Sequence, residues 1–589
     1  MRLPRPRAIS FTPFSSEFQG YKTSTFRQDV TAALAVALLT IPQSIAYSLL
    51  AGLPPTAGFF SAIFGTILTA TWGSSKQLVS GPSTGVALLI QTSIADILYT
   101  HYETVTGAAK EALVFHLLTH ILLIMGVIQI ASAFFNVSKL LQFVSRSVVL
   151  GYFAGITVAI GISQVFYLFG VPRPVDEGLI LYKAAFFLTH FTFMNPVALV
   201  VGLVGLAVLL LFRYYLKNWP DALFAILAAS LLGWAFQLWG VGPRVETLRD
   251  FNVNTGLFPQ LTWPLFDLKL VNQVFPAAVA ISFLAILEVF SISRSFASRG
   301  GYSVQTNQDV FGLGIGNLAL SFIVGALPTS GSTTRTALNV RMQACTRMAA
   351  ILSGAFTAAI MYLCWPLVQR IPLAALAVLL IATLPALTNW QELKLSFKAT
   401  REDAWVFLLT FFSCLVFSLD IAFFIGIVIS IATYLKKSSE PYLVEYAFNS
   451  KGRLVIVSPK EEVYRKVRII GIGGELYFAA ADFVESAMAQ LVDDPHVEAL
   501  VLRLNNVHHM DASMCLALIH LNDALKAKGH YLLISGLTDE VWRVFHRAGL
   551  MKSIGLDNLY FTDESNPQFS TWKACLRAQK LIHGRQSEE

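Results

Sequence analysis

Two segments of the chain combine a proline and glycine break with hydroxyl side chains and then begin a helical pattern. The first reads QLVSGPSTGVALL (residues 77–89) and the second reads GALPTSGSTTRTALN (residues 325–339). Each predicts an extended piece, a break and a helix that begins within an apolar region. The start of such a helix presents free N–H groups and the positive end of its dipole, which suit an anion. The alternative for either segment alone is an ordinary loop between helices.

Arg335 lies in the first turn of the second predicted helix. The helix dipole disfavours a cation there unless a negative group is nearby. A guanidinium also offers paired donors that fit the oxygens of sulfate or a carboxylate. The alternatives are an ion pair with a structural carboxylate, or a side chain that extends to the membrane surface.

Glu288, within AISFLAILEVFSIS (residues 280–293), is the carboxylate that we place well inside an apolar segment. A charge there is costly, so it marks a functional site by default, and it could bind and release a proton. The alternative is a structural ion pair with Arg335. Three further carboxylates lie near the ends of apolar segments, where helix caps and solvated faces explain them: Asp29, Asp309 and Asp420.

In the first apolar segment, Pro42 interrupts the helical pattern, and Gln43 precedes Tyr47 by one turn. Both side chains can therefore face one cavity, where the amide and the phenol would bind an oxyanion without charge. The alternative is a buried pair that ties helices together.

The composition is that of an integral membrane protein. Of 589 residues, 55% are hydrophobic and 13% are charged, with a mean hydropathy of +0.60. Soluble domains carry about 25% charged residues. The formal net charge of +7 does not indicate nucleic acid, because the basic residues form no stripe with aromatics. The five cysteines lack metal-ligand spacing, so neither a metal site nor a disulfide framework is expected.

Apolar stretches that could cross a bilayer recur between residues 30 and 435, about fourteen in all. We place them at 30–49, 56–72, 83–99, 112–134, 146–169, 194–213, 222–239, 274–293, 310–326, 333–347, 349–366, 373–389, 404–418 and 420–435. A further apolar piece, LILYKAAFFLTHF, is too short for a span and is expected to lie at the membrane interface. More Lys and Arg fall in the loops that would be cytoplasmic if the N-terminus is, which predicts an even number of spans with both ends in the cytoplasm.

From Ser438 onward the composition is that of a soluble α/β domain. KVRIIGIGGEL, EALVLRL and HYLLISG predict short buried strands, and the segments between them have helical periodicity. We therefore expect five parts: a cytoplasmic N-terminal segment (1–29), a transmembrane transport domain (30–437), a linker (438–460), an α/β domain (461–565) and a polar tail (566–589).

Five stretches in this order resemble the sulfate permease (SulP) family of anion transporters. They are PQSIAYSLLAGLPPTAGFFSA, SGPST, LEVFSISRSFA, the NQDVFGLGIGN region and LPTSGSTTRTALN. The C-terminal domain resembles a STAS domain, so the resemblance covers nearly the whole chain.

The resemblance implies an all-α polytopic membrane domain of seven-plus-seven inverted repeats. A core domain with two half-helices moves against a gate domain, and the protein is a homodimer in a bacterial cytoplasmic membrane. The substrate lies between the half-helices, facing the first span. The residues implied around it are Gln43, Tyr47, Ser83, Thr84, Ser332, Thr334 and Arg335, with Glu288 as the ion-coupling carboxylate.

The family's sodium-coupled bicarbonate branch has an Asp at the coupling position and a Thr one turn later, where this chain has Glu288 and Ile292. Ile292 offers no oxygen to sodium, which favours proton coupling, although Ser291 or Ser293 could supply a ligand. Related STAS domains carry a phosphorylatable serine at the position of Ser513. The adjoining Ser and Gly are missing here, so dimerisation, folding or binding of a cytoplasmic partner is expected instead.

These observations predict a proton-coupled symporter of sulfate or a related oxyanion or dicarboxylate, working by alternating access. The alternatives are a sodium-coupled bicarbonate symporter, an uncoupled anion exchanger or channel, and a receptor that reports an anion through its STAS domain. An enzyme is not expected, because the sequence shows no nucleophile–base pair, P-loop or metal cluster. No cofactor is expected beyond the coupling ion.

Overall fold

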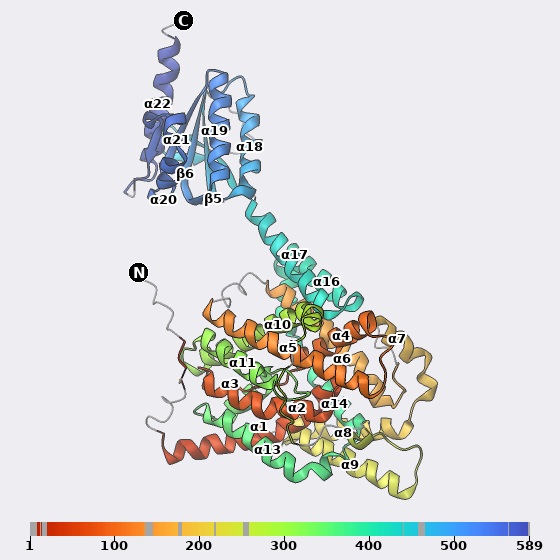
Figure 1. The fold of residues 1–589 in the computed structure, drawn as a ribbon. Coiled ribbons are helices and arrows are strands. Elements are labelled where there is room, and N and C mark those ends of the chain that lie inside the picture. The colour runs from red at the N-terminus through yellow and green to blue at the C-terminus, as the bar shows by residue number, and fades with distance from the viewer. Residues whose placement is uncertain are drawn as a thin grey trace. The chain divides into compact units, whose positions relative to one another are not determined.

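The computed structural model describes residues 9–11, 13, 21–135, 145–174, 180–216, 220–250, 258–264, 266–439, 441–457, 466–563 and 565–586. Two compact units divide the chain, Met1–Ser430 and Ile431–Glu589. The first unit is helical, and the second contains a sheet with helices on it (Figure 1).

The helices of the first unit overlap every predicted span. They are α1 (Thr23–Leu50), α2 (Pro55–Phe60), the π-helix η2 (Ser61–Gly65), α3 (Thr66–Trp72), α4 (Thr84–His101), α5 (Ala108–Phe134), α6 (Arg146–Phe169), α7 (Ile180–Thr189), α8 (Pro196–Tyr215), α9 (Asp221–Trp239), α10 (Leu268–Gly300), α11 (Thr306–Leu320), α12 (Thr333–Arg341), α13 (Met348–Val368), α14 (Leu373–Leu387), α15 (Trp390–Ala399), α16 (Arg401–Val416) and α17 (Leu419–Ser439). The short α7 is the apolar piece expected at the membrane interface.

Within the described ranges, eight helices are long and apolar enough to cross a membrane, or nine if the bent pair α14 and α15 forms one span. The other predicted spans fall on helices that are shorter or interrupted. The clearest case is α12, which has nine residues and follows a break in the chain. A helix of that length cannot cross a bilayer alone.

The helices pack in two groups. In the first group α1 packs on α13, α5 on α10 and α11, and α3 on α11. In the second group α6 packs on α14 and α16, and α8 packs on α9 and α14. Glycines permit close approach of these helices, because a Cβ added at Gly126 of α5 would lie 2.7 Å from the Leu318 backbone nitrogen.

A two-stranded antiparallel sheet joins two distant parts of the first unit. Strand β1 (Ser80–Gly81) pairs with β2 (Ser330–Gly331), with Ser80 opposite Gly331 and Gly81 opposite Ser330. Each strand comes directly before one of the two helices that the sequence places after a break.

The second unit is a six-stranded sheet in the order β4-β3-β5-β6-β7-β8. The strands are β3 (Tyr442–Phe448), β4 (Leu454–Ile456), β5 (Val467–Leu476), β6 (Ala499–Met510), β7 (Tyr531–Leu537) and β8 (Leu559–Phe561). Strands β5 to β8 pair in parallel, whereas β3 is antiparallel to β4 and β5. The helices are α18 (Phe478–Val492), α19 (Ala512–Ala527), α20 (Asp539–Ala548), α21 (Leu550–Ile554) and α22 (Phe569–Gln586). This confirms the predicted α/β domain.

Ordered elements of this unit also lie outside the predicted bounds of the α/β domain. The expected linker (438–460) contains β3 and β4, because YLVEYAF supplies a strand that pairs with β5 over five residues. The expected polar tail (566–589) contains α22. Its Ala574, Ala578 and Ile582 recur every fourth residue and are buried against the sheet face that carries Val501 and Leu533.

The burial of α22 gives a first prediction. Ala578→Asp places an unpaired carboxylate in that apolar contact and should destabilise the second unit by about 3 kcal/mol. The measurement is hydrogen exchange of the β7 amides in the full-length protein, which should become faster. The control is Gln579→Asp on the exposed face of the same helix. Equal exchange in the two variants would contradict the placement of α22.

Candidate functional site

The β1–β2 pair brings the starts of α4 and α12 together. Ser83 is the N-cap of α4, and its Oγ accepts a hydrogen bond of 3.4 Å from the Val86 amide. Ser332 is the N-cap of α12, and its Oγ accepts one of 3.4 Å from the Arg335 amide. The two helix starts therefore sit on neighbouring strands, as the sequence predicts for two half-helices.

Further hydrogen bonds satisfy the backbone around this junction. The Ser332 amide donates to the Val79 carbonyl at 3.1 Å, and the Val79 amide donates to Thr336 Oγ1 at 3.1 Å. The Ser80 carbonyl accepts a bond of 2.6 Å from Thr66 Oγ1. Lipid offers no hydrogen-bond partners to backbone N–H and C=O groups. Because these bonds provide such partners, the extended pieces can exist inside an apolar domain.

Among the residues that the structure describes, Arg335 is the largest fully buried side chain, with 0% of its surface exposed. Its Nη2 donates to the Pro82 carbonyl at 2.6 Å, so it bridges from α12 to the start of α4. Its Nε and Nη1 have no hydrogen-bond partner within the described chain. Among those same residues no carboxylate lies within 4.0 Å of the guanidinium, so neither sequence alternative applies: Arg335 is not ion-paired and does not reach the surface.

Gly81 makes room for this guanidinium. A Cβ at this position would overlap Arg335 Nη1, and the Gly81 φ of +144° is one that other residues rarely adopt. The close approach of β1 to Arg335 therefore depends on glycine.

Glu288 of α10 lies at the same junction. Its Oε2 accepts a hydrogen bond from Ser330 Oγ in β2, and Ser83 also interacts with the carboxylate. A Cβ added at Gly85 would lie 3.2 Å from Glu288 Oε1, which places the carboxylate against the first turn of α4. The charge of Arg335 acts on Glu288, although the two groups form no ion pair within 4.0 Å.

Helix α1 faces both helix starts. Gln43 Nε2 donates to Thr334 Oγ1 at 3.3 Å, and Gln43 Oε1 is buried without a partner in the described chain. The Tyr47 hydroxyl interacts with Thr84, and the charges of Arg335 and Glu288 act on it. The neutral polar groups of the first span therefore point into the junction.

The structure thus brings eight predicted residues together at one place. They are Gln43, Tyr47, Ser83, Thr84, Glu288, Ser332, Thr334 and Arg335. Their part in binding stays a prediction. Ser513 lies elsewhere, in the first turn of α19, where Asp511 Oδ1 accepts from the Met514 amide at 3.0 Å.

Sequence reasoning missed the residues that support this junction. Asn317 is fully buried, and its Oδ1 accepts from the Thr329 amide at 2.7 Å while its Nδ2 donates to Gln129 Oε1 at 2.8 Å. Ser330, which bonds Glu288, was likewise not singled out. Gln129 and Asn317 are amide residues within apolar helical segments, and this contrast is the sequence signal that could have identified them.

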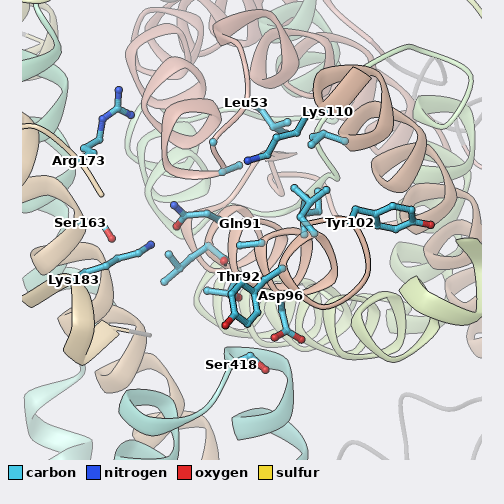
Figure 2. A pocket seen from close by; sticks show the side chains of 18 of the residues that line it. Leu53, Gln91, Thr92, Asp96, Tyr102, Lys110, Ser163, Arg173, Lys183 and Ser418 are labelled. Atoms are coloured by element: carbon cyan, nitrogen blue, oxygen red, sulfur yellow. Dashed lines mark hydrogen bonds between the residues drawn. The ribbon is translucent and has the colours of Figure 1, made fainter. Parts of the chain in front are cut away.

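A cavity of about 1190 Å³ lies farther along α4, beyond the junction. Leu88, Gln91, Thr92 and Asp96 of α4 line it, one to three turns after Thr84. The other walls come from the end of α1, from α5, α6 and α7, and from the start of α17, and Figure 2 shows Ser163, Lys183 and Ser418 among them. By the predicted orientation this cavity opens to the outside.

Comparisons with known proteins agree with the two-unit organisation. A model described as the sulfate permease family matches residues 26–410, and a STAS domain model matches residues 458–565. A putative sulfate transporter of Bacillus subtilis, YvdB, is 24% identical over 549 residues, which cover 93% of this chain and 98% of that protein. Probable sulfate transporter 4.2 of Arabidopsis thaliana is 26% identical, over 90% of this chain and 79% of its own.

Two solved structures share the fold. The murine Solute Carrier 26 family member A9 anion transporter, in an inward-facing state, has a TM-score of 0.85 and 20% identity, covering 98% of this chain and 97% of that one. The transmembrane domain of the cyanobacterial bicarbonate transporter BicA has a TM-score of 0.59 and 19% identity, covering 70% of this chain and 98% of its own.

The contact between Gly81 and Arg335 gives a second prediction. Gly81→Ala should displace the guanidinium and lower the free energy of unfolding by about 3 kcal/mol, because backbone strain and overlap add. Thermal unfolding of the full-length protein measures this. The control is Gly301→Ala, which has a φ of +68° but no described heavy atom within 4 Å of the added Cβ. A Gly81 variant no less stable than the Gly301 variant would contradict this packing.

Proposed function

The chain belongs to the sulfate permease family, and on that premise we propose that this anion transporter carries sulfate or a related small oxyanion or dicarboxylate together with protons. It is a multi-pass membrane protein and not an enzyme. The finer assignment of substrate, coupling ion and mechanism is our proposal.

The observation that carries the proposal is the state of Arg335. Arg335 is fully buried, and two of its guanidinium nitrogens lack hydrogen-bond partners in the described chain. Burying a charged group without such partners costs folding free energy. An anion with two oxygens would satisfy both nitrogens, and the converging helix starts would add N–H groups and dipole charge of the same sign. The site therefore suits an oxyanion.

The side chains around Arg335 favour a divalent oxyanion over a halide. Ser332, Thr334 and Gln43 form a connected set of hydroxyl and amide groups, which could bind the remaining oxygens of a tetrahedral or carboxylate group. The relatives at full length carry the name sulfate transporter, and this supports sulfate as the first anion to test.

The surroundings of Glu288 support proton coupling over sodium coupling. Ile292 lies one turn after Glu288, and its Cδ1 would be 3.1 Å from a Cβ at Gly331, so an apolar group occupies this position. Ser291 is exposed, and Ser293 Oγ donates to the Phe290 carbonyl at 3.4 Å. Sodium usually needs several oxygen ligands, whereas a proton needs only the carboxylate.

The proposed cycle uses the two helix groups as the parts that move. Glu288 takes a proton from the outside, the anion docks on Arg335, and the group that carries both slides against the α6–α14–α16 group to release them inside. We place the protein in a cytoplasmic membrane, with both termini in the cytoplasm and as a homodimer. The STAS domain would serve dimerisation or a cytoplasmic partner.

Glu288→Gln tests the coupling. We expect the purified protein in proteoliposomes to take up labelled sulfate, fumarate or bicarbonate above equilibrium only when an inward proton gradient is imposed. Because glutamine cannot exchange a proton, the variant should lose this uphill uptake and keep measurable anion binding. Glu402→Gln, at an exposed position of α16, is the control and should behave like the wild type.

Other outcomes of this experiment have definite meanings. A Glu288→Gln variant that still concentrates anion on acidification would contradict the coupling role. Uphill uptake driven by sodium would instead assign a sodium-coupled symporter, and uptake indifferent to both gradients would assign an uncoupled exchanger or channel.

Arg335→Ala tests the anion site. Removing a buried, charge-assisted pair of hydrogen bonds should weaken sulfate binding by about 100-fold, which corresponds to about 3 kcal/mol. Isothermal titration calorimetry of the detergent-solubilised protein measures the dissociation constant. Arg299→Ala is the control, because that guanidinium lies over the Phe296 ring, 5.6 Å from its centroid, and away from the junction. Equal affinity in both variants would place the anion elsewhere.

A further inference from the structure

The side chains that line the cavity along α4 carry more negative than positive charge, which does not favour the entry of an anion. Five carboxylates line it against three cationic side chains. The carboxylates are Asp96, Glu103, Glu111, Glu246 and Asp250, and the cations are Lys110, Arg173 and Lys183. Asp250 is paired with Arg244, at 2.6 Å, so the excess rests on the other four carboxylates. An excess of carboxylates concentrates cations rather than anions. This wall therefore suits the entry of the coupling ion, and the attraction for the anion must come from deeper in the protein.

Asp420 continues this acidic wall into the protein. It lies in the first turn of α17, directly after Ser418 and Leu419, which line the cavity. Only 9% of its surface is exposed, and its Oδ1 has no hydrogen-bond partner in the described chain. Its charge acts on Asp96 of α4, and Asp96 points toward the segment of Ser418 in Figure 2.

Hydrogen bonds to loop amides hold the other two carboxylates near segment ends. Asp29 accepts hydrogen bonds from the Cys345 and Thr346 amides. Asp309 Oδ1 accepts hydrogen bonds from the amides of Ser74 and Ser75, at 2.6 and 2.9 Å, while its Oδ2 is buried without a partner in the described chain. Asp420 differs in its place, because it follows directly on the cavity-lining Ser418 and Leu419, where water can reach a carboxylate oxygen whose lack of a partner would otherwise cost about 1–3 kcal/mol or more.

Tyr152 of α6 is the next polar group inward. Only 1% of its surface is exposed, and its hydroxyl has no hydrogen-bond partner within the described residues. Its ring packs edge-on against Phe423, at 5.2 Å between centroids and one turn after Asp420. The charges of Asp420 and Glu288 both act on the hydroxyl.

Helix α6 also reaches the junction itself. Ile156 follows Tyr152 by one turn, and its Cδ1 would be 3.8 Å from a Cβ at Gly85, beside Glu288. Farther along the same helix, Ala159 and Ser163 line the cavity. One helix thus borders the cavity, the unpartnered hydroxyl and the site.

We propose that Asp96, Asp420 and Tyr152 deliver protons from the cavity to Glu288. This inference rests on the proposed proton coupling and names the route of the proton. Asp420 takes a proton from Asp96 and passes it to the Tyr152 oxygen, while the Tyr152 hydroxyl gives its own proton to Glu288. Tyr152 ends as a neutral phenol and Asp420 as a carboxylate, and water from the cavity bridges the gaps.

The charged and titratable groups around this route are few among the described residues. His101 acts on Asp96, and Cys414 of α16 acts on Tyr152. At the inner end, Arg335 and Tyr47 act on Glu288. In the proposed function Arg335 binds the anion and Glu288 binds the proton, so both bind at the same junction.

Asp420→Asn and Tyr152→Phe test the route in proteoliposomes. Each should slow sulfate uptake driven by an inward proton gradient by about tenfold or more, because a positioned proton donor is lost. Neither should change sulfate exchange at equal pH on both sides, since exchange can proceed with the proton held on Glu288. The controls are Tyr99→Phe, which lines the same cavity, and Glu402→Gln, at an exposed position of α16 outside it, and both should keep the wild-type rate of proton-driven uptake.

The outcomes separate this inference from the proposed function. Wild-type uptake that ignores the proton gradient would overturn both. Proton-driven uptake in the wild type, with unchanged rates in both variants, would overturn the route alone. Equal slowing of uptake and exchange would show a structural defect and also overturn it. In the Glu288→Gln background, the route predicts that Asp420→Asn leaves exchange unchanged.

Discussion

The backbone N–H and C=O groups of the two interrupted segments need hydrogen-bond partners inside an apolar domain. The rest of the site depends on which partners they find. The segments before α4 and α12 satisfy each other as β1 and β2, with Thr66 and Thr336 completing the bonds. Because each strand is only two residues long and each helix starts within three residues of its strand, the two N-termini lie close together. The proposed anion site is therefore a consequence of the same hydrogen bonds that satisfy the backbone at the two breaks.

In the proposed function, charge balance at this junction links the binding of the anion to the binding of the proton. Arg335 and two helix starts contribute positive charge, and Glu288 is the carboxylate whose charge acts on Arg335. Since these two groups do not form an ion pair within 4.0 Å, neither neutralises the other by direct contact. An anion on Arg335 makes a negative charge on Glu288 less favourable, so binding of the anion promotes binding of the proton. This reciprocity is what a symporter requires.

Much of this arrangement could be predicted from the sequence, because polar residues stand out in apolar segments. Gln43, Glu288 and Arg335 are conspicuous for that reason, and the repeated break pattern predicted the two helix starts. The helices at about fourteen predicted spans also follow directly from hydropathy. Long apolar runs leave few alternatives to helix in a bilayer.

What escaped prediction depends on contacts between distant residues. Asp420 looked like a helix cap by its position, and its place beside the cavity, where Asp29 and Asp309 are instead bonded to loop amides, appears only in the folded chain. Tyr152 sits in an ordinary apolar segment with nothing local to mark it. The strands β3 and β4 were missed because they are short, and the helix α22 because its apolar stripe is small residues every fourth position; both find their partners only when the sheet is assembled.

The most direct test of the central claim is the position of a bound anion. Selenate is close to sulfate in shape and charge, and crystals grown with it would show selenium by anomalous scattering. The account predicts a peak within hydrogen-bond reach of Arg335 Nε and Nη1, between the starts of α4 and α12. A peak only in the cavity, beside Lys183 or Arg173, with none at Arg335, would contradict it.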